Sequence, residues 1–368
     1  GTYGTNGFYL PFKQDYTVEG FSTVTYTGNG GTQYIGGTGF QPDLVWTKLR
    51  SQAGSHSLAD SIRGGTKVLR SDLTDAEVTR ADHIQSFDTD GFTIGADGTS
   101  NLNGRTNVAW NWDMGGSNAT NTNGSITSTV RANPTYGQSI VSYTGNGTAG
   151  ATVGHGLNSK PEMIIIKSRS GSAKSWYVYH EGLHASSPED YRVELNTTNA
   201  ASSNTTGNSL QGTAPTNSLF TLGNGSWVNE NTKTLIAYCF HSVTGYSKFG
   251  SFTGNGGSQT ITTGFRPAFL LVKRSSNSSG WYIIDNTRSP SNPAKNYLSP
   301  NSSSSEGIAS GGINFTDTGF QETGFINDNG QTVIYMAFAD TREYAYWLDQ
   351  SGNNNDWTSN NLTESDVM

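Results

Sequence analysis

The chain has 368 residues, of which 33% are hydrophobic and only 14% are charged, and it contains 46 glycines. Its net charge of −7 comes without a cluster of Lys and Arg, which argues against binding to nucleic acid. No apolar run approaches the ~20 residues of a membrane-spanning helix, so we expect no membrane insertion. Short Val, Ile, Tyr and Phe runs between Thr, Ser, Asn and Gly instead predict an all-β protein with many turns.

A repeated motif organises most of the chain. The string Thr-Gly-Asn-Gly begins at Thr27, Thr144 and Thr253, each time after an aromatic residue, at offsets of 117 and 109 residues. Glycine supplies positive φ and Asn tolerates it, so each motif predicts a turn at the end of a strand.

Other features keep the same register after each turn. A proline is followed six positions later by a lysine in every copy, at Pro42 and Lys48, Pro161 and Lys167, and Pro267 and Lys273. The apolar runs between them, DLVWT, EMIII and AFLLV, predict one buried strand with proline at its start. Each copy ends in a second apolar run, VAWNW, LIAYCF or VIYMAF, which predicts a final strand.

The sequence therefore predicts three tandem β-sandwich or jelly-roll-like repeat units with the same strand order, which should superpose. We place an N-terminal strand segment at 1–19, the units at 20–116, 137–243 and 245–341, a Ser/Thr/Asn/Gly-rich linker at 117–136, and a C-terminal segment at 342–368.

The amino-acid sequences of the repeats resemble a known family. GFQPDLVWTKLRS, SWYVYHEGL and GFRPAFLLVKR are similar to a repeat domain of unknown function found in virion proteins of marine bacteriophages, and the likeness covers about residues 20–341. The resemblance implies a tail-fibre or other structural protein at the virion surface or outside the cell.

The two ends resemble a second module. NGFYLPF at 6–12 and the segment 349–368 are similar to the opening of a concanavalin-like module. This resemblance implies that the repeats interrupt one module, so the two phrases should lie within roughly 30 Å of each other. It also implies that the chain is a fragment or processed form of a longer protein.

The segment HEGLH, from His180 to His184, fits a zinc-protease motif in which two histidines lie one helical turn apart. The preceding residues predict a strand, and Gly182 weakens a helix. The sister units carry Asp60 and Asp285 at the position of His180. We therefore expect no metal site and no zinc binding here.

Two further groups of residues are candidates for ligand binding. Asp60 with Arg63, and Asp285 with Arg288, are either turn-locking ion pairs or contacts to a saccharide. Trp176 occupies the same place in the second unit as Trp281 does in the third. Both rings either stack on sugar or cap a sandwich core.

Cofactor signals are weak. The Asp-rich turns at 88–91 and 349–356 offer oxygen ligands for calcium, but neither has the spacing of a recognised calcium loop. The single cysteine, Cys239, lies in an apolar run and is expected to be a core residue. No other cofactor is predicted.

The first hypothesis is a non-enzymatic virion appendage protein, such as a tail fibre, that binds host-surface polysaccharide or other virion proteins. The alternatives are a capsid decoration or lattice module without sugar binding and, third, a polysaccharide depolymerase. Surfaces poor in charge are readily buried against copies of themselves, so we expect a homo-oligomer, a trimer or a higher assembly. The alternative is that three units in one chain already supply a pseudo-threefold cluster, which would fit a monomeric decoration module.

Overall fold

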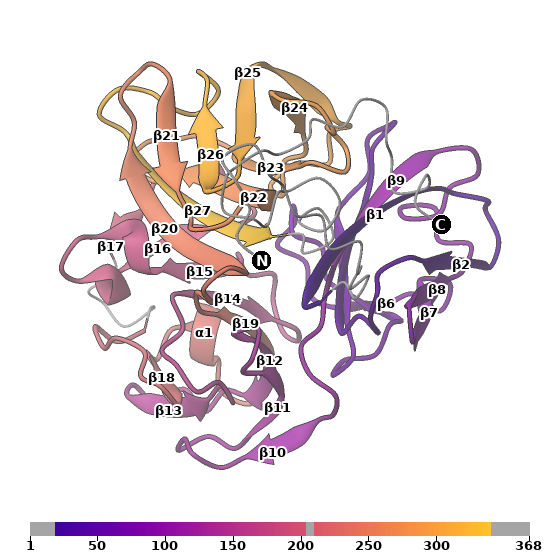
Figure 1. Cartoon of the computed structure of the whole chain (residues 1–368). Helices are drawn as coiled ribbons and strands as arrows, with labels where there is room; N and C mark the ends of the chain where they lie inside the picture. Colours follow the sequence, from indigo (N-terminus) through magenta and orange to yellow (C-terminus); the bar gives the residue numbers. More distant parts are fainter. Residues whose placement is uncertain (1–18, 204–209, 340–368) are drawn as a thin grey trace, which may run out of the picture.

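The computed structural model describes residues 19–203 and 210–339, which form an all-β structure of packed antiparallel sheets, as predicted. Figure 1 shows three groups of strands around a common centre. We call β1–β9, β10–β19 and β20–β27 the first, second and third units.

The elements of each unit have the following bounds. The first unit contains β1 (Phe21–Thr27), β2 (Gln33–Gly36), β3 (Leu44–Leu49), β4 (Ser57–Asp60), β5 (Lys67–Val68), β6 (Val78–Thr79), β7 (Ile84–Asp88), β8 (Gly91–Ile94) and β9 (Thr106–Trp112). The second contains β10 (Ala119–Asn121), β11 (Ser128–Asn133), β12 (Gln138–Thr144), β13 (Ala151–Gly154), β14 (Met163–Ser168), β15 (Tyr177–His180), η1 (Glu181–Leu183), η2 (Pro188–Asp190), β16 (Tyr191–Glu194), β17 (Ser202–Ser203), β18 (Leu219–Leu222), α1 (Ser226–Asn229) and β19 (Thr234–Phe240). The third contains β20 (Ser247–Thr253), β21 (Gln259–Thr262), β22 (Pro267–Arg274), β23 (Trp281–Asp285), β24 (Ala294–Tyr297), β25 (Gly307–Thr316), β26 (Gly319–Glu322) and β27 (Thr332–Ala339).

Each unit has a main sheet with one strand order. The order is β1-β9-β3-β4 in the first unit, β12-β19-β14-β15 within the larger sheet of the second, and β20-β27-β22-β23 in the third. A smaller sheet lies over one face of each main sheet, and the side chains between them form that unit's own sandwich core. Superposition of the three units stays a prediction.

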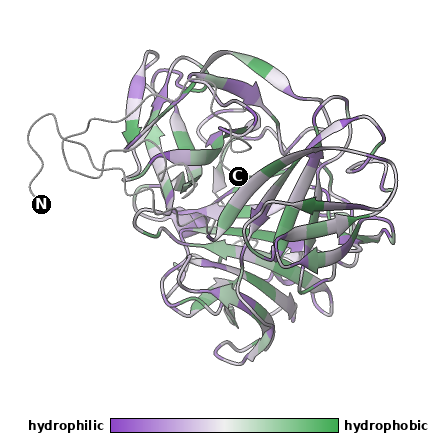
Figure 2. Ribbon diagram, turned by 45° about the vertical axis from the view of Figure 1, so that its right-hand side comes forward, coloured by the Kyte–Doolittle hydropathy of each residue, from purple (hydrophilic) through white to green (hydrophobic). Residues whose placement is uncertain are grey.

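The opposite faces of the three main sheets meet in one shared core. Along β9, for example, Ala109 points into the sandwich core, whereas Val108, Trp110 and Trp112 point into the shared core. The strands β19 and β27 alternate in the same way. Figure 2 accordingly shows hydrophobic segments in the strands where the three units contact one another. The central strands are therefore buried on both faces, which explains the uninterrupted apolar runs of β19 and β27.

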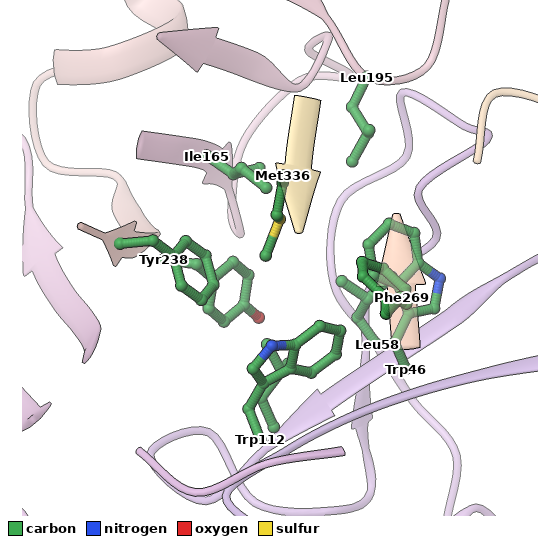
Figure 3. Close-up of a pocket in the computed structure, with 10 residues that line it drawn as sticks. Trp46, Leu58, Trp112, Ile165, Leu195, Tyr238, Phe269 and Met336 are labelled. Atoms are coloured by element: carbon green, nitrogen blue, oxygen red, sulfur yellow. The ribbon is translucent and has the colours of Figure 1, made fainter. Parts of the chain in front are cut away.

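The centre of the shared core is tightly packed. Figure 3 shows side chains from all three units, among them Trp46, Tyr238 and Met336, converging on one point. They leave a void of only about 10 Å³. A void of this size holds at most one water molecule and is too small for a ligand.

The predicted linker is wrong in part. Residues 119–121 and 128–133 are strands β10 and β11, which add to the edge of β12 and extend the second main sheet. Ile126 and Val130 are buried in the core of the second unit. The sequence did not predict these strands because their few alternating buried positions lie in a segment rich in Ser and Thr. The strands pair because the edge of β12 has unpaired backbone groups.

The Thr-Gly-Asn-Gly turns carry the chain from the main sheet to the smaller sheet. The second glycine of each motif, Gly30, Gly147 or Gly256, has φ of 68°, 67° or 76°. The first glycine is required by close approach, since a Cβ on Gly145 would lie 2.4 Å from the carbonyl oxygen of Glu230. The predicted turns are present, and glycine rather than Asn adopts positive φ in them. In the second unit the side-chain oxygen of Asn146 instead accepts a hydrogen bond from the backbone of Thr148.

One buried asparagine in each unit braces this turn. Asn229 is fully buried, its side-chain oxygen accepts from the backbone of Asn146, and its amide nitrogen donates to the carbonyls of Thr148 and Gly223. Asn101 and Asn327 make the corresponding contacts in the first and third units.

We expect Asn229→Ala to lower the free energy of unfolding by about 2–4 kcal/mol, because it leaves several buried groups of the turn without partners. Urea denaturation measures the loss. The exposed Asn123, changed to Ala, is the control and should alter stability by less than about 0.5 kcal/mol. An equal effect of both substitutions would contradict the bracing role.

The predicted proximity of NGFYLPF and the 349–368 segment concerns residues outside those that the structure describes. It remains a prediction.

Candidate functional site

The predicted ligand-binding residues of the first unit lie in its contact with the second. Asp60 closes the turn after β4 by accepting from the backbone of Arg63, and its other oxygen lies 2.5 Å from Nε of Arg63. Tyr238 of the second unit donates to the same Asp60 oxygen at 2.8 Å. The turn-locking interpretation of the Asp–Arg pair is confirmed, and the pair also joins two units.

A second layer of charge surrounds this pair. Glu77 contacts both Arg63, at 3.2 Å, and Arg169 of the second unit, at 2.9 Å. Burial alone would raise the pKa of Glu77, but the hydrogen bond from Arg169 and the charge of Arg63 outweigh it and hold this pKa below its usual value. The carboxylate therefore stays ionised between the two units.

The contact between the third and first units repeats the arrangement. Asp285 lies 2.6 Å from Nε of Arg288 and accepts at 3.0 Å from the indole of Trp110, which corresponds to Tyr238. Glu306 contacts Arg288 and, from the first unit, Arg50, each at 2.9 Å. Two of the three contacts between units thus hold the same buried ionic cluster.

The contact between the second and third units has no such cluster. His180 and Leu183 replace the aspartate and arginine. The ring of His180 accepts from the backbone of Gly182 at 2.9 Å and lies 3.0 Å from the carbonyl oxygen of Tyr335 in the third unit. Since its Nδ1 accepts, Nε2 must donate to Tyr335. Burial lowers the pKa of His180 to about 4, so the ring is neutral near pH 7.

The two candidate tryptophans also join units. The indole of Trp176 donates to the carbonyl of Arg70 in the first unit, and that of Trp281 donates to the carbonyl of Glu194 in the second. Both rings lie in the shared core rather than capping a single sandwich.

The interpretation of these six residues as a saccharide site needs correction. The exposed fractions are 0% and 1% for Trp176 and Trp281, 0% for Asp60 and Asp285, and 7% and 4% for Arg63 and Arg288. A glycan in solution cannot reach side chains that are enclosed between units. These six side chains instead hold the units together.

The lysines that follow the prolines have a related role. Lys167 donates to the carbonyl of Thr74 in the first unit, and Lys273 donates to that of Thr198 in the second. Burial lowers the pKa of Lys48, Lys167 and Lys273 to about 8. Lys48 donates to the carbonyl of Leu49 in its own unit. The spacing of these lysines is visible in the sequence, but the contacts of Lys167 and Lys273 are not, because each includes a backbone carbonyl of another unit.

The HEGLH segment does not form the zinc-protease geometry. His180 ends strand β15, residues 181–183 form a single 3-10 turn, and His184 stacks on Tyr191 with ring centroids 4.6 Å apart. Both ring nitrogens of His180 are engaged, as described above. Its failure to bind zinc remains a prediction.

The other cofactor and core predictions have separate outcomes. In the turn at 88–91, Asp88 accepts a hydrogen bond from Thr93 on β8, and Asp90 accepts one from the backbone of Gly39 in the loop after β2. The 349–356 segment lies outside the described residues. Cys239 is buried in the core of the second unit, as expected, and burial raises its pKa.

An open cavity of about 270 Å³ lies at the edge of the first unit, beside β11. Its lining residues are Phe40, Gln41, Asp43, Asp113, Gly115, Gly116, Arg131 and Asn133. Sequence reasoning missed it, because its walls come from three segments that are far apart in the chain and carry no recognised motif.

A buried ion pair forms one wall of this cavity. Asp43 pairs with Arg131, and its second oxygen accepts from the backbone of Met114 at 3.0 Å. Burial raises the pKa of Asp43 to about 6, although the charge of Arg131 opposes the shift. Arg131 also donates through Nε to Asn118. The guanidinium is therefore held in place at the cavity.

No helix among the described residues is long and apolar enough to cross a membrane. A family model described as a domain of unknown function, DUF7483, matches residues 17–342. A comparison with the curated proteins finds no match.

Proposed function

This chain belongs to the family of the domain of unknown function DUF7483, and from its own structure we propose that it is a structural and binding component of a bacteriophage appendage, such as a tail fibre, and not an enzyme. The observation that carries the proposal is the shared core, because three main sheets pack against one another within a single chain.

The contacts between units support a rigid block. They consist of buried ion pairs, indole hydrogen bonds and lysine ammonium groups bound to backbone carbonyls. The charged and aromatic side chains at these contacts thus fix the units to one another. Such a block presents its outer turns and the cavity beside β11 in a fixed geometry, which suits attachment to a virion protein or to a polysaccharide at the virion surface.

The resemblance of the repeats to phage virion proteins supports the same location. Antibodies against the chain should label an appendage on particles that carry the protein, as seen by electron microscopy. Label on the capsid lattice would favour the decoration module, and release of reducing sugar from a host polysaccharide would favour the depolymerase. Particles that contain the protein but expose no label on any surface would contradict the proposal.

Self-association is a separate proposal. The apolar faces of the three main sheets already cover one another within the chain, so a single chain supplies the cluster of three units that a trimer would otherwise form. We therefore expect light scattering of the chain to report 39.3 kDa. A stable multiple of this mass would restore the homotrimer.

A further inference from the structure

The cavity beside β11 is the place where the chain departs from its own repeat. In the register of the three units, Asp43 corresponds to Glu162 and Ala268, and Asp113 corresponds to His241 and Ala339. Glu162 is bound to the backbone and hydroxyl of Ser242. Only the first unit thus places two aspartates at this position.

The second wall of the cavity is also unique. Arg131 and Asn133 lie on β11, which pairs with the outer edge of β12. In the described part of the chain, no strand takes the equivalent place beside β1 or β20. The added strand and the two aspartates meet at one cavity, so the deviations from the repeat coincide in space. Contacts that merely hold units together recur, whereas this arrangement occurs once among the described residues.

The lining combines an aromatic ring with both kinds of hydrogen-bonding group. Phe40 is half-buried and Gln41 is exposed. One oxygen of Asp113 accepts from the backbone of Gly115 at 2.9 Å, which leaves its other oxygen able to accept from a ligand. Arg131 uses Nε and one terminal nitrogen internally, which leaves the other terminal nitrogen able to donate.

These groups match a sugar ring. A pyranose has an apolar face that packs on an aromatic ring, and its hydroxyl groups both donate and accept hydrogen bonds. The volume of about 270 Å³ lies just below the ~300 Å³ at which pockets begin to enclose drug-sized molecules, so it suits one small ring. Asp43 and Asp113 outweigh Arg131 by one negative charge when both are ionised, which disfavours acidic sugars.

We propose that this cavity binds one neutral saccharide unit of a surface glycan. The inference rests on the proposed binding role for its choice of ligand and extends that role to a defined site. It replaces Trp176, Trp281 and the two Asp–Arg pairs as the saccharide-binding residues.

The test uses the full chain and the methyl glycosides of glucose, galactose and N-acetylglucosamine, titrated by saturation-transfer NMR. At least one glycoside should bind. Gln41→Ala and Asp113→Asn should each weaken it about tenfold, which is the loss expected for one hydrogen bond to a polar or charged group. Gln41 is exposed, and Asn at 113 retains an oxygen for Gly115, so both variants should fold. Asp82→Asn, at an exposed carboxylate of the same unit, is the control and should bind normally.

Three results would overturn the proposal. These are no binding of any of the glycosides, equal binding by wild type and both cavity variants, or calcium binding that Asp113→Asn abolishes while sugars do not bind. Failure here does not alter where antibodies label the particle, so a failure of the proposed appendage function would be seen separately.

Discussion

Asp285→Ala should lower the free energy of unfolding by about 3–5 kcal/mol, because it leaves the guanidinium of Arg288 buried without its main partner. The side chains of both residues are fully buried. Trp110 would also lose the acceptor of its indole hydrogen bond across the contact between units. Guanidinium denaturation monitored by circular dichroism measures the change.

The second unit supplies a matched control. Its residues at these two positions are His180 and Leu183, which carry no ion pair. The double variant Asp285→His with Arg288→Leu removes both charges, so it should be less destabilised than Asp285→Ala by at least about 1 kcal/mol. A double variant as unstable as the single one would show that the buried unpaired charge is not the cause.

Acid should destabilise the protein from about pH 6.5 downward. The pKa of His180 is about 4 in the folded chain and near 6.5 in the unfolded chain. The unfolded state therefore binds more protons between these values, and stability falls as the pH falls. A shift of this size corresponds to about 3 kcal/mol lost between pH 6.5 and pH 4.

A substitution at His180 tests whether this residue causes the dependence of the free energy of unfolding on pH. His180→Gln should remove about 3 kcal/mol of this acid-dependent loss, whatever its effect on stability at pH 7. The half-buried His184, changed to Gln, is the control and should leave most of the loss in place. Urea denaturation at several pH values between 4 and 7 measures both. An unchanged slope in His180→Gln would contradict the assignment of a buried neutral ring to the contact between units.

The succession of strands along the chain could be predicted from the sequence because its signals are local. The turn motif, the proline-to-lysine spacing and the final apolar run each mark one element, and they recur in one order. The shared core has a sequence signal as well. LIAYCF and VIYMAF are apolar at consecutive positions, which is typical of strands buried on both faces. A single two-sheet sandwich with one solvated face would have shown cleaner alternation.

The functional assignments could not be predicted in the same way. Trp176 and Asp60 have polar neighbours along the chain, which is compatible with exposure, but the residues that bury them belong to another unit. The cavity depends on Phe40, Asp113 and Arg131, which are brought together only by the added strand β11. Neither long-range arrangement leaves a pattern within a short window of sequence.

The central claim is that three units form one cooperative body through a shared core. Native-state hydrogen exchange tests it most directly, because each unit contributes a central strand, β9, β19 or β27, to that core. We predict that the slowest amides of all three strands open with the same free energy, to within about 1 kcal/mol, because none can open without unfolding the others. Amides of one unit that exchange through an opening more than about 2 kcal/mol less costly, while the other two remain protected, would contradict it.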